Sequence, residues 1–418
     1  MAWIVALVWF GGGLVRIYRF ARFFQIEEYQ NGRYWRWLLA HPDRWGWRRP
    51  LIAWSLALVG SFLVIEGNSE ILFLLIFGVT AAIAGWPAQE REVKKAFVRT
   101  GRATRLLAAT FALFALVTLG AVLLVQQVAF AEVALSAYVF TALAGVLLLL
   151  LSPVFLIAGN VLAAPVEAAM RRMYLRRAQG VLRRLQPTII GITGSYGKTS
   201  TKHFLAHILS GRYRAIPTPK SYNTLMGVVL AVNTQLKNET DLDYFIVEMG
   251  AYIEGEIAEI CAFARPQISL VTAVGPQHLE RFGSLEATAN AKYEIVAALP
   301  PDGAAILNGD DPRVRAMAQR ASVAQTVLVS REEASGAALV ARKVKESLDG
   351  LDFDVVDTES GEARHFHAPV YGIHNVTNLL LATAAARQVG LSLGEIAMRV
   401  AALEPFEHRL QRTTWPGG

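Results

Sequence analysis

The feature that most constrains this chain is a series of long uncharged apolar stretches in its first 186 residues. Five such stretches occupy residues 1–15, 50–65, 71–89, 106–131 and 133–166. A membrane core of about 30 Å requires roughly 20 helical residues, and the last two stretches reach that length by themselves. We therefore predict a transmembrane region of about five spans over residues 1–165, in which the second and third stretches form a hairpin.

Basic residues alternate between the loops of this region. Residues 1–186 contain 20 Lys and Arg against 9 Asp and Glu, although the whole chain of 418 residues has a net charge of only +7. The basic residues gather in 16–49, 91–105 and 171–184, whereas 66–70 and 126–132 contain none. Cytoplasmic loops collect positive charge, so we expect five spans to place the N-terminus outside and residue 187 onward in the cytoplasm. Positive charge beside apolar runs indicates a membrane partner and no nucleic acid.

The chain changes character near Pro187. Residues 166–186 are rich in arginine and predict a basic juxtamembrane helix, which Pro187 ends. The residues from 187 onward hold 21 Lys and Arg against 25 Asp and Glu, as in a soluble domain. Cys261 is the one cysteine, so an internal disulfide and a cysteine metal site are excluded, and we expect a buried thiol.

A strand, a glycine-rich loop and a helix are predicted directly after Pro187. The run Thr188–Thr193 is typical of a buried parallel strand, and Thr201 to Leu209 has helical spacing. This context predicts that the loop between them binds phosphate through its N–H groups and the helix N-terminus. Lys198 would bridge the β- and γ-phosphates of a nucleotide, and the Thr199 hydroxyl would bind Mg²⁺. The predicted nucleotide-binding residues of the loop are Gly194, Ser195, Gly197, Lys198, Thr199 and Ser200.

This short loop and several later blocks resemble the Mur ligase family over residues 188–411. The resemblance is greatest to the branch that joins D-alanyl-D-alanine to the muramoyl tripeptide. It implies an α/β P-loop domain with a mostly parallel sheet over residues 187–411, after a helical transmembrane region. The alternating runs 338–344 and 351–356 add antiparallel strands at the sheet edge. The blocks follow the family's order: Thr193–Ser200, Tyr222–Gly227, Val247–Ala251, Gly255–Ile257, His278–Ser284, Ala291–Ile295, Asn308–Asp311 and Gly372–Asn378.

The resemblance also implies an activity and its catalytic residues. The activity is the ATP-dependent joining of an amine to a carboxylate through an acyl phosphate, in peptidoglycan precursor synthesis, with two Mg²⁺ ions. Glu248, after the strand 244–247, would bind Mg²⁺, and His278 would help to hold the second ion. Lys292 would be a further ligand, because the family commonly carbamylates the lysine at this position. Lys198, Lys292 and His278 form the implied catalytic set.

Other residues would contact the nucleotide and the acceptor. Asn308, Asp311, Asn375 and Arg409 would contact the nucleotide, although His408 stands where the family usually has glycine before that arginine. Asn223 would contact the acceptor substrate.

Simpler structural roles remain open for several of these residues. Glu248 would otherwise form a surface salt bridge, and Lys292 would be a helix-surface lysine. Asn308 and Asp311 would make an Asx turn before Pro312. His374, Asn375 and Asn378 would otherwise cap a helix from Asn378 to Val389.

Two departures from the family pattern affect the expected function. The membrane region stands in place of the family's sugar-nucleotide domain, which favours a muropeptide or lipid-linked acceptor and an amino acid or dipeptide donor at the bacterial inner membrane. Residues 412–418 are expected to begin a missing C-terminal domain, so this chain alone would be incomplete. A membrane-linked polyglutamate-type ligase and a catalytically incomplete nucleotide-binding membrane scaffold remain as alternatives.

Overall fold

The computed structural model describes residues 2–42, 96–128, 134–220, 222–277, 279–332 and 336–404, together with isolated positions between 51 and 79. The chain divides into two compact units, Met1–Arg171 and Arg172–Gly418. Most of the predicted apolar stretches 50–65 and 71–89 lies outside the described residues. The two units are therefore described separately, and the predicted domain boundaries stay a prediction.

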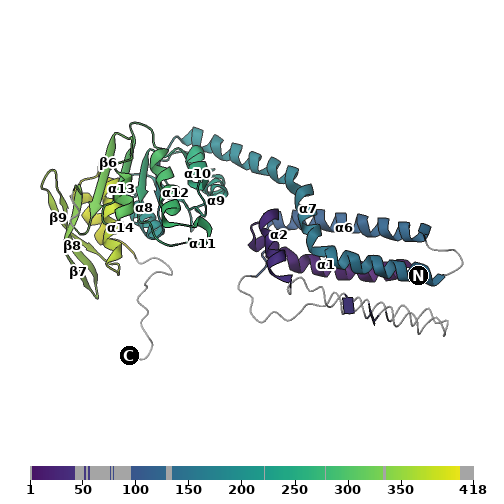
Figure 1. Cartoon of the computed structure of the whole chain (residues 1–418). Helices are drawn as coiled ribbons and strands as arrows, with labels where there is room; N and C mark the ends of the chain where they lie inside the picture. The colour runs from purple at the N-terminus through teal and green to yellow at the C-terminus, as the bar shows by residue number, and fades with distance from the viewer. Residues whose placement is uncertain are drawn as a thin grey trace, which may run out of the picture. The chain divides into compact units, whose positions relative to one another are not determined.

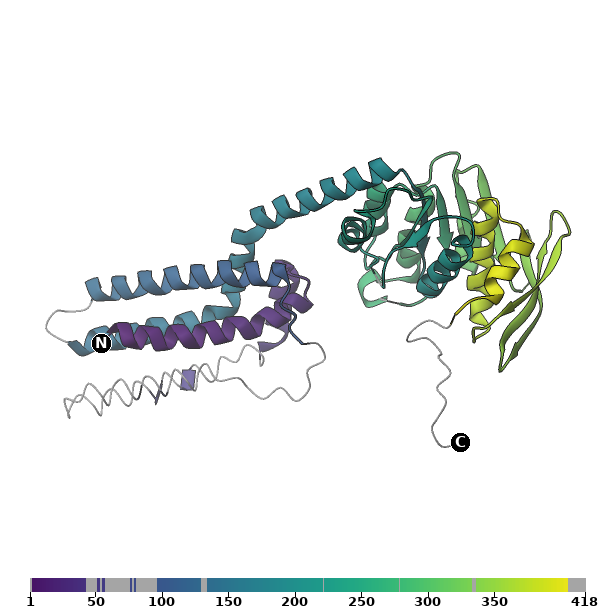
Figure 2. The same ribbon diagram turned by 180° about the vertical axis from the view of Figure 1, so that it is seen from behind.

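The first unit contains long helices that pack along one another. They are α1 (Ala2–Ile26), α2 (Asn31–Ala40), α6 (Gly101–Val128) and the first part of α7 (Ala134–Leu185). In both views, α1, α6 and this part of α7 run side by side (Figures 1 and 2). The Arg105 guanidinium of α6 forms a two-fold ion pair with Glu167 of α7, with N–O distances of 2.6 and 3.0 Å.

Two helices of the described residues are long and apolar enough to cross a membrane, by length and composition alone. They lie at Gly101–Gln127 and Leu143–Leu185 and include most of the last two predicted stretches. The first stretch, 1–15, is part of α1, which is not one of these two. Residues 166–185 of the predicted basic helix lie within α7, which is continuous for 52 residues despite Pro153 and Pro165.

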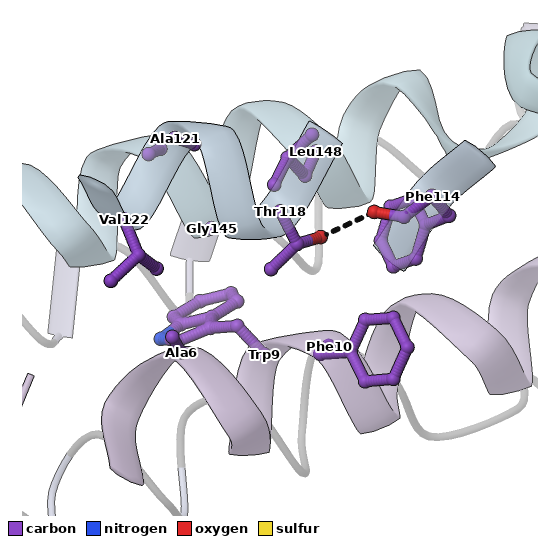
Figure 3. Close-up of a pocket in the computed structure, with 10 residues that line it drawn as sticks. Ala6, Trp9, Phe10, Phe114, Thr118, Ala121, Val122, Gly145 and Leu148 are labelled. Carbon is purple, nitrogen blue, oxygen red and sulfur yellow. Dashed lines mark hydrogen bonds between the residues drawn. The ribbon is translucent and has the colours of Figure 1, made fainter. Parts of the chain in front are cut away.

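Small residues let these helices approach closely. Figure 3 shows Trp9 and Phe10 of α1 with Val122 of α6 and Gly145 of α7 around a small apolar pocket. A Cβ at Gly145 would lie 2.7 Å from Cγ of Trp9, so a larger residue there would push α1 and α7 apart. Glycine at such contacts is common between helices that pack in a membrane.

The second unit is built on one mixed sheet of nine strands, in the order β2-β3-β1-β4-β5-β6-β7-β8-β9. The pairs from β2 to β7 are parallel, and β7, β8 and β9 pair antiparallel. The prediction of a mostly parallel sheet with antiparallel strands toward one edge is therefore confirmed. The strands are β1 (Thr188–Thr193), β2 (Ala215–Pro217), β3 (Tyr244–Glu248), β4 (Ile268–Val271), β5 (Ala304–Asn308), β6 (Gln325–Ser330), β7 (Leu339–Ser347), β8 (Gly350–Asp357) and β9 (Ala363–Ala368).

Successive residues of a strand point to opposite faces of the sheet, so these strands present apolar side chains on both faces. Helices cover each of the two faces. Ile190 of β1 lies in the core with α8 (Lys198–Leu209), α14 (His374–Gln388) and α15 (Leu393–Ala401). Ile189 lies in the opposite core, which also contains Ala178 near the end of α7. The carboxyl ends of β1, β3, β4 and β5 meet at one edge of the sheet. The other elements are α9 (Leu225–Ala231), the π-helix η1 (Val232–Leu236), α10 (Glu256–Ala264), α11 (Leu279–Phe282), α12 (Leu285–Ala297) and α13 (Pro312–Met317).

Candidate functional site

The loop between β1 and α8 turns on two glycines with positive φ. Gly194 has a φ of +146° and Gly197 a φ of +81°, which residues with a Cβ rarely adopt. Space is also lacking, because a Cβ at Gly197 would lie 2.3 Å from Oδ1 of Asn378. The turn brings the N-terminus of α8 to the carboxyl end of β1, which is a favourable place for a phosphate group.

Hydrogen bonds hold this loop against the segment after β4. The Ser195 N–H donates to the carbonyl of Ala273 at 2.7 Å, and the Gly275 N–H donates to Ser195 Oγ at 2.9 Å. The Lys198 ammonium donates to the carbonyls of Gly194 and Ser195 in the same loop. A cation therefore lies directly beside the N-terminus of α8, as the predicted phosphate-binding role requires. Ser200, on the first turn of α8, is buried.

The carboxylate of Glu248 brings three predicted site residues together. Its Oε2 accepts a hydrogen bond from Thr199 Oγ1 at 3.0 Å and lies 3.0 Å from Nζ of Lys202. Its Oε1 accepts from Asn223 Nδ2 at 3.4 Å. Glu248 is only 2% exposed, so the alternative of a surface salt bridge is wrong. A buried carboxylate with this many donors is held in one position.

The contact between Asn223 and β3 explains two of the sequence blocks. The Gly250 N–H donates to the Asn223 carbonyl at 2.7 Å, and a Cβ at Gly250 would lie 2.9 Å from Asn223 Cγ. Thr224 then caps α9 by accepting from the Gly227 N–H at 3.2 Å. The loop 222–227 and the end of β3 therefore form one packed unit beside the carboxylate.

The oxygens of Thr199 and Glu248 suit Mg²⁺, which prefers hard oxygen ligands. Mg²⁺ usually takes one or two protein carboxylates together with substrate phosphates and water. No group of three or more His, Cys, Asp and Glu side chains in the described part of the chain is arranged to hold a metal. An ion at this carboxylate would therefore depend on nucleotide phosphates for much of its coordination. His278, predicted for the second ion, lies outside the described residues.

Lys292 of α12 is a buried lysine at 4% exposure, so the alternative of a helix-surface lysine is wrong. Burial, and after it the positive charge of Lys198, lower the pKa of its ammonium group from 10.5 to about 8. The ammonium lies 5.6 Å from the centre of the Phe282 ring. Lys292 is therefore within electrostatic reach of Lys198 and carries an amine that loses its proton more easily than that of an exposed lysine.

A cleft of about 390 Å³ opens beside the phosphate loop between β1 and α8, and Asn308 of β5 and Asp311, the residue before α13, both line it. Asn308 Nδ2 donates to the carbonyl of Thr272 at 2.8 Å. Asp311 caps α13 through Oδ1 and accepts from the Val274 N–H at 2.8 Å through Oδ2. The predicted turn before Pro312 is therefore present, and these side chains fix the cleft wall. Other lining residues are Tyr196, Asp310, Arg331, Glu332, His374 and Thr377.

The alternative of helix caps at residues 374–378 is wrong, because α14 begins at His374, four residues earlier than predicted. Asn375 Nδ2 donates to the Tyr371 carbonyl at 2.7 Å, and Asn378 Nδ2 donates to Asn375 Oδ1 at 2.9 Å. Asn378 Oδ1 in turn accepts from Thr201 of α8 at 3.3 Å. These asparagines join α14 to the phosphate-loop helix, and Asn378 and His374 line the cleft. Arg409 lies outside the described residues.

The sequence reasoning missed Lys202, which forms a buried ion pair with Glu248. A signal for it was present, since Lys202 occupies the same face of α8 as the core residues Leu205 and Leu209. A charged residue on an apolar helix face needs a partner inside the protein. Cys261 is buried as predicted.

Comparisons with known proteins agree with this geometry. Residues 192–386 match the Mur ligase middle domain. A UDP-N-acetylmuramoyl-tripeptide–D-alanyl-D-alanine ligase of Mycobacterium tuberculosis is 40% identical over 229 residues, which cover 54% of this chain and 43% of the relative. The Escherichia coli ligase of the same name is 33% identical over 239 residues, covering 56% and 50%. The chain thus matches half or less of the length of these curated relatives.

A solved structure shares the fold of the second unit. The crystal structure of MurF from Acinetobacter baumannii is 25% identical, with a TM-score of 0.52, and the match covers 58% of this chain and 51% of the other. A MurF ligase from Thermotoga maritima in complex with ADP has a TM-score of 0.50 at 24% identity, which indicates the fold alone.

Proposed function

We propose that the chain is an ATP-dependent ligase that joins an amine, such as D-alanyl-D-alanine, to a muropeptide carboxylate, since residues 192–386 match the Mur ligase middle domain. The observation that carries the proposal is the arrangement around Glu248. Thr199, at the phosphate loop, donates to this one buried carboxylate. Asn223, from the loop 222–227 that we call the acceptor loop, donates to it as well. The proposal is further supported by relatives that bear this activity in their names.

The proposed reaction has two steps. An acceptor carboxylate oxygen attacks the γ-phosphorus of ATP, so that a C–O–P link forms and ADP leaves. The amine then attacks the acyl carbon, a C–N bond forms, phosphate leaves, and the nitrogen gives up a proton. Here the loop N–H groups and Lys198 hold the phosphates, and Asn223 orients the acceptor. Mg²⁺, held through Thr199 and Glu248, would supply positive charge to the transferring phosphoryl group.

Lys292 is proposed to react with carbon dioxide, so that its amine becomes a carbamate and one proton is released. The reaction requires the neutral amine. With a pKa of about 8, about one tenth of the group is neutral at pH 7, far more than for an exposed lysine. The carbamate would add oxygen ligands for a second Mg²⁺, together with His278.

The first unit is proposed to attach the ligase to the bacterial inner membrane as a multi-pass protein, with the second unit in the cytoplasm. Two helices of sufficient length and apolar composition support the attachment. The alternating basic loops support the orientation. Such an enzyme would meet a lipid-linked muropeptide at the inner leaflet, while ATP and the amine arrive from solution.

The proposal is tested by measuring phosphate release from ATP by the full-length gene product in membranes. The acceptor is either UDP-muramoyl tripeptide or its lipid-linked form, with and without D-alanyl-D-alanine. We expect release only when acceptor and amine are both present, and loss of release in Lys198→Ala. Lys237→Ala, at an exposed lysine after η1, is the matched control.

The outcomes separate the alternatives. Release that depends on a glutamate donor would favour the polyglutamate-type ligase. Tight ATP binding without release for any acceptor would leave a nucleotide-binding scaffold and end the ligase proposal.

A further inference from the structure

Lys202 lies in the interior of the second unit, and its ammonium contacts two elements of the site. Its side chain is fully buried, and its Nζ lies 3.0 Å from Glu248 Oε2. Nζ also donates to the carbonyl of Lys220 at 2.6 Å. Lys220 has a φ of +46° and lies just before the acceptor loop. The ammonium is therefore fixed between α8, the end of β3 and this loop.

A buried charge pair of this kind has a structural cost. Desolvation of the two ions cancels much of their mutual attraction, and an apolar pair of similar volume often gives equal or greater stability. Stability alone therefore gives little reason for a lysine here. The contact of Lys202 with the Glu248 carboxylate, which also accepts from Thr199, gives a different reason for a lysine at this position.

We propose that Lys202 is a positioning residue that holds the Glu248 carboxylate in the correct orientation for the metal–nucleotide complex. The inference rests on the proposed function, because it takes Glu248 as a metal ligand. Oε2 receives both Lys202 and the Thr199 hydroxyl, so the lysine aligns this oxygen with the phosphate loop. Oε1 receives only the longer contact from Asn223 among the hydrogen bonds described for it. Lys202 would thus act through Glu248.

The test measures Mn²⁺ affinity in the ADP complex of the full-length protein by electron paramagnetic resonance, in the wild type, Lys202→Met and Lys202→Gln. Loss of a group that orients a metal ligand typically weakens metal binding by about 10- to 100-fold. We expect this loss in both variants, while ADP affinity without metal stays unchanged. Gln can still donate to the Lys220 carbonyl, so it serves if Met does not fold. Lys237→Met is the matched control.

Each outcome decides something. Equal or tighter Mn²⁺ binding in the variants would overturn the inference, since Lys202 would then be a neutral filler or a competitor of the metal. An equal loss of metal-free ADP binding would also overturn it, by showing general damage to the site. Absence of Mn²⁺ binding to the wild-type ADP complex would instead refute the metal role of Glu248 in the proposed function.

Discussion

Replacing Lys292 by methionine is expected to stabilise the protein while it abolishes ligation. The pKa of the buried ammonium falls from 10.5 to about 8. One pKa unit corresponds to about 1.4 kcal/mol, so burial disfavours the charged form by about 3 kcal/mol. The Phe282 ring at 5.6 Å returns about 1 kcal/mol by a cation–π interaction. The net gain on removing the charge is therefore about 2 kcal/mol.

Methionine suits this test because it has similar length and its sulfur packs well against an aromatic ring. The assay is the melting temperature of the full-length protein in detergent at pH 7, in buffer freed of carbon dioxide so that no carbamate forms. For a domain of this size, 2 kcal/mol corresponds to a rise of about 4–8 °C. Phosphate release in the ligase assay should be lost in the same variant.

The pH dependence gives a second check on the same reasoning. Below pH 8 the lysine is charged in both folded and unfolded states, so the full penalty applies. Between about pH 8 and 10.5 the folded protein has already lost the proton, and the penalty disappears as pH rises. The advantage of Lys292→Met should therefore shrink over this range. A variant that melts at or below the wild-type temperature at pH 7, while Lys237→Met is unchanged, would refute the argument.

Three further variants test other parts of the second unit. Gly197→Ala should weaken ATP binding at least about tenfold by calorimetry, because its φ is +81° and the new Cβ would meet Asn378. Phe353→Ala should lower the free energy of unfolding by about 3–5 kcal/mol in chemical denaturation, since this ring is buried in the core. Hydrogen bonds lower the pKa values of Asp352 and Asp354, chiefly from a histidine of β9 and from a lysine of β7 respectively. Their stabilisation is present above about pH 4 and is lost as pH falls through the lowered pKa values, so the double asparagine variant should melt below the wild type at pH 5, and this difference should shrink as pH falls below about 4.

The sequence pattern predicted the strands whose position depends mainly on residues close to one another in the chain. The β-branched run 188–193 is β1 to the residue, and the alternating runs after residue 338 are the antiparallel strands β7 and β8. The strand β4 ends at Val271, although apolar residues continue to Val274, because the Ala273 carbonyl turns to accept from Ser195 in the phosphate loop. An apolar pattern contains no information about that contact.

The interior of the site depended on contacts between distant parts of the chain. Glu248 is separated from Lys202 by 46 residues, and only the pairing of β3 with β1 brings them together. The start of α14 was misplaced for the same reason. Its asparagines resemble caps in sequence, but they bond to Tyr371 and to Thr201 of another helix.

The end of α7 determines where the second unit can be separated from the first for expression by itself. Asn233 Nδ2 donates to the carbonyl of Tyr174 at 3.0 Å, and the Arg184 guanidinium donates to the carbonyl of Lys237 at 2.8 Å. Ala178 and its apolar neighbours on this segment complete the core beneath α9 and η1. A shortened protein that began at Pro187 would expose this apolar surface to solvent, and an exposed apolar patch promotes aggregation. A protein that began near Arg172 would keep the last turns of α7, which bury this apolar surface.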